Sequence, residues 1–147
     1  MSYRAEQSGN TINLGPELAR GGEGIIYAVA GMPGLVAKVY SRPPQTQKKL
    51  KLQRMAEAAS EDLLGFTAWP KERLLDGSGE VCGFLMPRVD TRREDVHVLY
   101  SPKSRVASFP DVDFRFLSRV VTNVARAFAV IHEAGHVIGD INHGHML

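Results

Sequence analysis

A lysine inside an apolar run follows a glycine-rich turn at a spacing that suits an anion site. The turn is Gly21-Gly22-Glu23-Gly24, and Lys38 follows its last glycine by 14 residues (38 − 24). Glycines let backbone N–H groups approach an anion without a Cβ in the way. A lysine on the next strand of the hairpin can then reach the same anion as a point charge. Taken alone, the turn fits a tight hairpin better than a binding loop.

The elements that must position these residues are three strands, a helix, two more strands and a long helix. β-branched and aromatic runs between glycine and proline turns predict strands over 14–20, 25–29, 35–40, 71–75 and 81–89. A run without glycine or proline predicts a helix over 45–60. Apolar residues at three- and four-residue spacing predict a second helix over 112–134, with Gly135 placed to cap it. This order predicts an α+β fold with a mostly antiparallel sheet.

Length and composition predict one globular domain. The 147 residues are 44% hydrophobic, and 18 basic against 16 acidic side chains give a formal charge of +2, which argues against a dedicated nucleic-acid binder. The single cysteine, Cys82, excludes an internal disulfide framework and a four-cysteine zinc site. The first residues lack the apolar core of a secretory signal, and no run approaches the ~18 apolar residues of a membrane span. We therefore expect a cytoplasmic protein without a nucleic-acid or membrane partner.

Several motifs, in one order, resemble those of the protein kinase family. The segment Leu18–Tyr27 resembles the glycine-rich loop, and Val36–Val39 resembles the third-strand Val-Ala-Ile-Lys motif. Met86–Val89 falls where the family has its hinge. Ile131–Asn142 resembles a long helix that runs into a catalytic loop, in a Gly-Asp-x-Asn form similar to that of divergent bacterial kinase-like proteins. The resemblance extends over 12–147, nearly the whole chain.

The resemblance implies an ATP site and catalytic residues. Lys38 would bind the α- and β-phosphates, and Asp140 would accept the proton of the substrate hydroxyl or orient that hydroxyl. Glu57 follows Lys38 by 19 residues (57 − 38) and would pair with it. Glu61 is a rival for this role, and an ordinary solvated glutamate is the alternative.

The same resemblance assigns the contacts of the nucleotide. Three glycines would lie over the phosphates, three apolar residues would enclose the adenine, Met86 would be the gatekeeper beside it, and backbone groups of the hinge would hydrogen-bond to it. These residues are Leu18, Gly21, Gly22, Gly24, Ile26, Ala37, Met86, Pro87 and Val89.

The chain departs from the family in and after the catalytic loop. Gly139 stands where the family has an arginine, and Asn142 stands where a lysine is frequent. His145 stands where the family has a metal-binding asparagine, and imidazole favours softer metals than Mg²⁺. His145 and Asn142 are therefore only candidate metal ligands.

The family's domain also continues beyond this sequence, through the metal-binding Asp-Phe-Gly motif and several helices. The resemblance thus implies an incomplete kinase-like domain: a five-stranded antiparallel N-lobe sheet with one helix, then one C-lobe helix. The expected parts are a disordered 1–11, an N-lobe over 12–89, a connector over 90–111 and the start of the C-lobe over 112–147. An uncovered helix 112–134 would expose an apolar face, which predicts self-association.

A second pattern points to zinc chemistry. His132-Glu133-Ala-Gly-His136 satisfies the H-E-x-x-H spacing, in which two imidazoles bind Zn²⁺ and the glutamate activates water. That site needs a helix that continues through His136, whereas Gly135 favours a helix end. A zinc peptidase would also leave the glycine turn and Lys38 unexplained, so we rank it last.

We therefore expect a kinase-like domain that uses ATP and Mg²⁺ to phosphorylate a serine or threonine hydroxyl of a protein. The alternative, from another class, is a catalytically inactive kinase-like module that binds a nucleotide or a protein. Gly139, His145 and the missing metal-binding segment favour this alternative for the chain taken alone.

Overall fold

The computed structural model of the chain describes residues 2–89 and 96–139. The chain divides into two compact units, Met1–Arg88 and Val89–Leu147. Three residues singled out in the sequence, Asp140, Asn142 and His145, lie outside the described residues.

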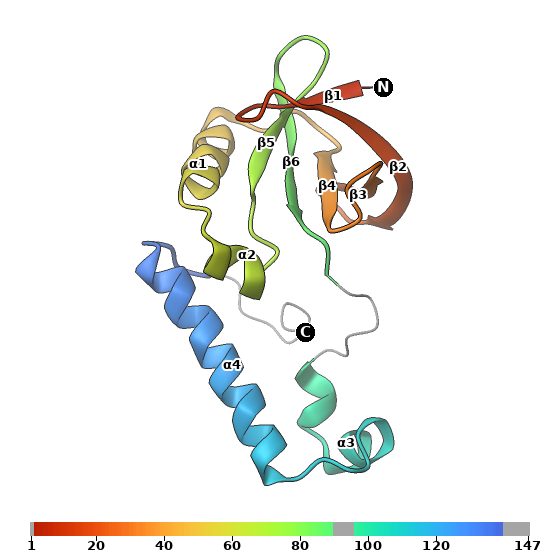
Figure 1. The fold of residues 1–147 in the computed structure, drawn as a ribbon, viewed down its shortest axis with the longest axis vertical. Helices are drawn as coiled ribbons and strands as arrows, with labels where there is room; N and C mark the ends of the chain where they lie inside the picture. The colour runs from red at the N-terminus through yellow and green to blue at the C-terminus, as the bar shows by residue number, and fades with distance from the viewer. Residues whose placement is uncertain (1, 90–95, 140–147) are drawn as a thin grey trace. The chain divides into compact units, whose positions relative to one another are not determined.

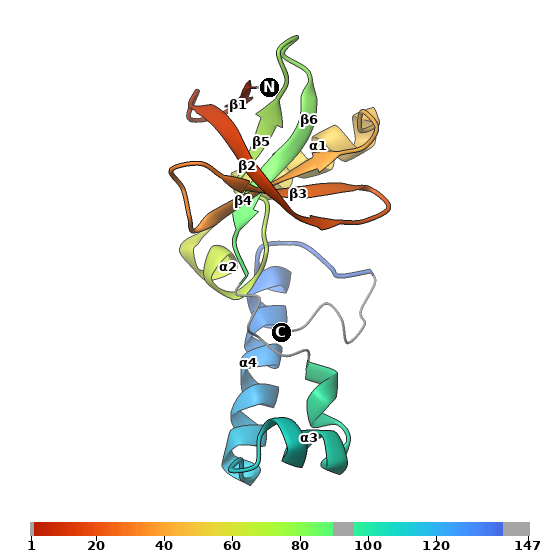
Figure 2. The same ribbon diagram turned by 90° about the vertical axis from the view of Figure 1, so that its right-hand side faces the viewer.

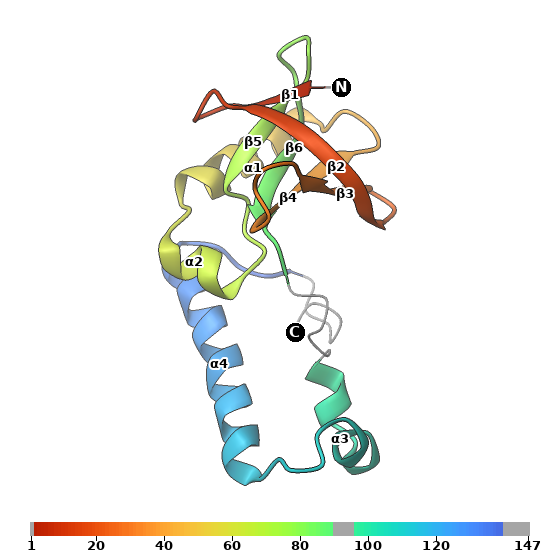
Figure 3. The ribbon, with the colours of Figure 1, turned by 45° about the vertical axis from the view of Figure 1, so that its right-hand side comes forward.

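The first unit is built around six antiparallel strands that close into a barrel in the order β1-β2-β3-β4-β6-β5 (Figure 1). The strands are β1 Ser2–Ala5, β2 Thr11–Arg20, β3 Gly24–Val29, β4 Leu35–Tyr40, β5 Glu72–Leu75 and β6 Val81–Pro87. Figure 3 shows β2 curving across the sheet from the end near β1 to the hairpin with β3. Two register shifts in β2 opposite β3 interrupt the regular pairing there, and such bulges increase strand bending.

The closed barrel corrects the expected five-stranded sheet. Its sixth strand, β1, comes from the segment expected to be disordered. β1 pairs with β2 at Tyr3↔Ile12 and with β5 at Ala5↔Leu74. The polar sequence concealed this strand because only alternate residues need to be apolar, and Ala5, which is fully buried, supplies one of them. Closure also leaves no open sheet edge.

The interior of the barrel is the core of the first unit. It is formed by small and branched apolar side chains, one from each strand: Ala5, Ile12, Val29, Ala37, Leu74 and Leu85. Because side chains alternate along a strand, the residues between these point to the outer face of the barrel.

Two helices follow β4 where one was predicted. Figure 2 shows both in the first unit, α1 Thr46–Glu57 and α2 Glu61–Phe66. The break lies at Ser60, whose hydroxyl accepts a hydrogen bond from Leu63 N–H (3.2 Å) and so caps a new helix. α1 lies beside β5, where Arg73 Nη1 donates to the Lys49 carbonyl (3.2 Å). The outer face of the barrel under α1 is thus the face that carries Arg73.

The second unit contains η1 Val96–Leu99, α3 Pro102–Ser108 and α4 Phe114–Glu133. The first two lie in the segment expected to be a plain connector. α4 begins at Asp113, whose carboxylate accepts from Phe116 N–H (2.9 Å). It exposes apolar side chains such as Phe114 and Val121. Self-association through 112–134 therefore stays a prediction. No helix in the described ranges is long and apolar enough to cross a membrane.

Candidate nucleotide-binding site

Strand register places Lys38 on one continuous outer face of the barrel. Lys38 on β4 is directly opposite Ile26 on β3 and Phe84 on β6, and Val36 is opposite Met86. Directly opposite residues of an antiparallel pair point to the same side of the sheet. We call this set, Ile26, Val36, Lys38, Phe84 and Met86, the Lys38 face. It is an apolar surface with an ammonium group in its middle strand.

Ala37 does not belong to this surface. It is fully buried in the barrel interior, opposite Leu85. Ala37 was expected to help enclose the adenine, but neighbouring residues of a strand point to opposite sides, so Ala37 faces away from the side that carries Lys38. Val36, two residues before Lys38, occupies the place expected for Ala37. The period of two in the strand would have identified Val36 from the sequence.

The fold requires a glycine at only one of the three glycine positions in the turn. A Cβ on Gly24 would lie 2.3 Å from the carbonyl oxygen of Val39, so the close approach of β3 to β4 requires a glycine. A Cβ on Gly83, on the other side of β4, would lie 2.1 Å from the Lys38 carbonyl oxygen. By contrast, Gly21 and Gly22 have open space around the Cβ position, and neither has a positive φ. The fold therefore requires Gly24 and leaves Gly21 and Gly22 free for another role.

Charged groups converge at the end of the Lys38 face nearest the glycine turn. Glu23 accepts from Lys48 Nζ on α1 (2.8 Å), and its other carboxylate oxygen lies 3.7 Å from Lys38 Nζ. Hydrogen bonding and charge from Lys48, with a smaller contribution from Lys38, lower the pKa of Glu23. Tyr40 lies between the lysines, with its ring centroid 5.9 Å from Lys38 Nζ and 4.5 Å from Lys48 Nζ. Burial, followed by the charge of Glu23, raises the pKa of Tyr40 to about 12.

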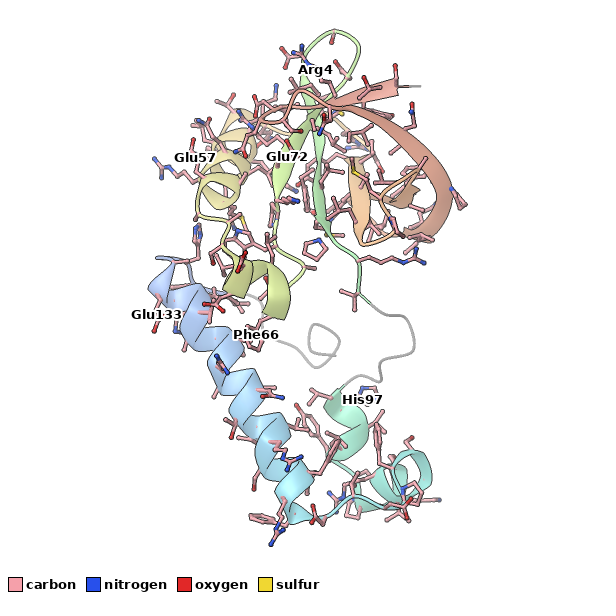
Figure 4. All side chains as sticks on the ribbon, in the orientation of Figure 1. Arg4, Glu57, Phe66, Glu72, His97 and Glu133 are labelled. Atoms are coloured by element: carbon pink, nitrogen blue, oxygen red, sulfur yellow. The ribbon has the colours of Figure 1, made fainter. Side chains whose placement is uncertain are left out.

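Glu57 is not paired with Lys38. Figure 4 labels it on α1, where it is exposed at the last helical residue and accepts from Gln53 Nε2 (2.9 Å). The buried stripe of α1 carries Leu52 and Ala56. The next residue, Glu57, is turned about 100° away from Ala56 around the helix axis. Glu61 is exposed in the first turn of α2.

Two of the remaining predicted contacts, Leu18 and Pro87, belong to strands of the first unit. Leu18 lies between the Glu17↔Tyr27 and Ala19↔Ile26 pairs of β2 and β3, at a bulge, and is 42% exposed. Pro87 closes β6 opposite Leu35, and Val89 begins the second unit.

The zinc pattern does not form a helical site. α4 ends at Glu133, and Gly135 has a φ of 78°. Gly135 N–H donates to the His132 carbonyl (2.9 Å) and His136 N–H to the Ile131 carbonyl (3.1 Å), which is the hydrogen-bond pair of a Schellman cap. His136 therefore does not lie one helical turn beyond His132. Within the described ranges, no group of three His, Cys, Asp or Glu side chains could hold a metal ion.

Sequence reasoning missed Glu23 and Lys48 as members of this site. One signal was available: Lys48 lies at the third residue of a helix whose first turn carries no acidic residue. A lysine is electrostatically unfavourable at the positive end of a helix, which suggests that an anion lies nearby.

Comparison with known proteins gives matches of two kinds. Two curated relatives, both called protein kinase YegI, from Escherichia coli K12 and O157:H7, are 43% identical over 136 residues. The alignment covers 92% of this chain and 21% of each relative, so the chain spans about a fifth of their length. No family model matches the chain.

Two solved structures share the fold. Vaccinia related kinase 3 aligns with a TM-score of 0.60 at 18% identity, over 96% of this chain and 44% of the other. The PknI kinase domain of Mycobacterium tuberculosis aligns with a TM-score of 0.57 at 20% identity, over 90% of this chain and 53% of the PknI chain. The chain is therefore similar to one part of two proteins named as protein kinases, and it shares the fold of solved protein kinase structures.

Proposed function

We propose that the chain is the ATP-binding part of a protein serine/threonine kinase, in which the nucleotide lies against the Lys38 face. The observation that carries this proposal is the placement of Lys38 beside a turn with two glycines, Gly21 and Gly22, that the fold does not require. Both glycines are exposed, so a phosphate can approach the turn without meeting a side chain, and the lysine supplies a positive charge near the same end of the sheet. The Gly21 N–H itself closes the turn, because it donates to the Gly24 carbonyl (2.9 Å). Ile26 and Met86 on this face are partly exposed and offer the apolar surface that a purine ring needs, whereas Val36 is buried.

Transfer would follow the chemistry of other phosphoryl transfers. The γ-phosphoryl group passes to a protein hydroxyl, and the ADP oxygen leaves with the electron pair of the broken P–O bond. Lys38 would hold the α- and β-phosphates, while Asp140 would orient the hydroxyl and take its proton. Mg²⁺ neutralises the phosphates in such reactions. Its ligands among Asn142 and His145 stay a prediction, because both residues lie outside the described ranges.

Nucleotide binding by three forms of the chain tests the first step. A fluorescent ATP analogue should bind to the unmodified chain and to Lys49→Met, because Lys49 pairs with Glu80 rather than with the glycine turn. Lys38→Met should weaken binding about tenfold or more, since it removes a charge-assisted contact of roughly 1.5–3 kcal/mol. Equal affinity of Lys38→Met and Lys49→Met would refute the ATP site.

Transfer is tested separately, with radioactive γ-labelled ATP and a general protein substrate. Asp140→Asn should abolish transfer while leaving ATP binding intact. If a full-length protein that contains this chain binds ATP but transfers nothing under any divalent metal, the inactive kinase-like module is the correct function instead.

A further inference from the structure

One carboxylate bridges two lysines at the glycine turn. Glu23 uses one oxygen for Lys48 Nζ (2.8 Å) and the other for Lys38 Nζ (3.7 Å). Glu23 is itself largely exposed, whereas the side chains of Lys38 and Lys48 are 28% and 38% exposed. The two ammonium groups are thus the more fixed partners, and the carboxylate is an anion held between them.

The surroundings orient Lys48 towards this position. Its Nζ lies 4.5 Å from the Tyr40 ring centroid, within the range of a cation–π contact. Its backbone lies in the first turn of α1, where no acidic side chain and no side-chain cap neutralise the positive end of the helix. A cation there is unfavourable unless an anion compensates it. Lys48 therefore contributes to a positive site that already accommodates one anion from the protein.

We propose that Lys48 is a second phosphate-binding residue and that Glu23 is a built-in competitor, whose carboxylate leaves both lysines when a nucleotide polyphosphate binds. This inference rests on the proposed ATP site and adds two residues to it. A carboxylate and a phosphate make the same charge-assisted contact with an ammonium group, so the protein's own anion indicates where the ligand's anion fits. The polyphosphate carries more charge than one carboxylate and can contact both lysines.

Two opposite changes in affinity follow. Glu23→Gln removes the competing anion while keeping a side chain of the same size, so ATP should bind about threefold more tightly. Lys48→Met removes a cation while keeping an apolar side chain of similar length, so ATP should bind roughly fivefold more weakly. Lys48→Arg keeps the charge and should retain the affinity of the unmodified chain. Adenosine has no phosphate, so neither change should alter its binding.

The test is a titration of the unmodified chain and its variants with ATP and with adenosine. Lys49→Met is the matched control, because it makes the same change one residue further along α1, at a lysine that pairs with Glu80. Thermal melts of every variant verify that the chain is folded. We expect Lys48→Met to bind ATP more weakly and adenosine unchanged. We expect Glu23→Gln to bind ATP more tightly.

Other outcomes overturn the inference in distinguishable ways. If Lys48→Met binds ATP like Lys49→Met while Lys38→Met loses it, Lys48 has no role and the proposed function stands. If Glu23→Gln weakens ATP binding, Glu23 supports the loop instead of competing with the nucleotide. If the unmodified chain and all variants fail to bind ATP, the proposed function fails as well.

Discussion

Replacing Gly24 by alanine tests whether the last glycine of the turn serves the fold and not the ligand. The new Cβ would lie 2.3 Å from the Val39 carbonyl oxygen and 3.1 Å from the Tyr40 Cα. Ordinary contact begins at 3.4 Å, so the strands must separate by about 1 Å. Both obstructing atoms belong to the backbone of β4, which cannot rotate away as a side chain can. We expect a loss of about 2–3 kcal/mol, at the upper end of the usual cost of overpacking.

The matched variants are Gly21→Ala and Gly22→Ala, three and two residues earlier in the same loop. Their Cβ positions are open and their φ angles are not positive, so the free energy of unfolding should change by less than about 0.5 kcal/mol. If the glycine turn approaches a phosphate, these two variants should weaken ATP binding without loss of stability. The three alanines would then separate a structural glycine from two ligand-facing ones.

The assay is urea unfolding followed by the fluorescence of Trp69. This is the chain's single tryptophan and it is buried in the first unit, so its emission reports on the unfolding of that unit. With a urea dependence of about 2 kcal/mol per molar, Gly24→Ala should lower the midpoint by about 1 M or more. Equal midpoints for Gly24→Ala and Gly21→Ala would refute the reasoning from strand contact.

Three further predictions concern stability and reactivity. Arg73→Met should lower the free energy of unfolding in urea by about 2 kcal/mol, because Arg73 donates twice to Glu6 (2.5 and 2.7 Å) from a side chain only 14% exposed. The control Arg20→Met breaks an exposed ion pair and should lower it by less than about 1 kcal/mol, so equal losses would contradict the role of burial. Burial raises the pKa of the Cys82 thiol from 9.0 to about 11, so at pH 8 its thiolate fraction should be about 100-fold below that of the urea-unfolded chain. The rate of alkylation, measured by mass spectrometry, should fall by the same factor, and similar rates in the two states would show that the thiol is accessible and ionised. Asp113→Ala should weaken the start of α4 by about 1 kcal/mol and speed hydrogen exchange in its first turn, while exchange unchanged from the parent chain would exclude the cap.

Local patterns in the sequence were sufficient for the position and type of most elements. The strand 35–40 is β4 Leu35–Tyr40 in the structure, and the helix expected over 112–134 is α4 Phe114–Glu133. The end of α4 at Glu133 was also predictable, because the glycine that follows it, Gly135, has the positive φ that this helix cap requires. In the same way, the turn of glycines followed by Lys38 identified the candidate site.

Local patterns were not sufficient for β1 or for the second helix, α2, which begins after Ser60, where the predicted helix ended. β1 is too short and polar to be stable alone, and pairing with both β2 and β5 makes it a strand. The pairing partner of Lys38 also depended on tertiary structure. Spacing along the chain favoured Glu57, but the buried stripe of α1 turns that residue outwards and brings Lys48 to Glu23.

The sequence by itself therefore determined strands β2 to β6, the long helix and the kinase-like glycine turn with its lysine, because these depend on residues near one another in the chain. Only the tertiary structure decided which side chains meet. The barrel register placed Val36 rather than Ala37 beside Lys38, and the packing of α1 on the outer face brought a second lysine to Glu23. Contacts between segments far apart in the chain depend on register and helix rotation, which a single sequence specifies only through the complete fold.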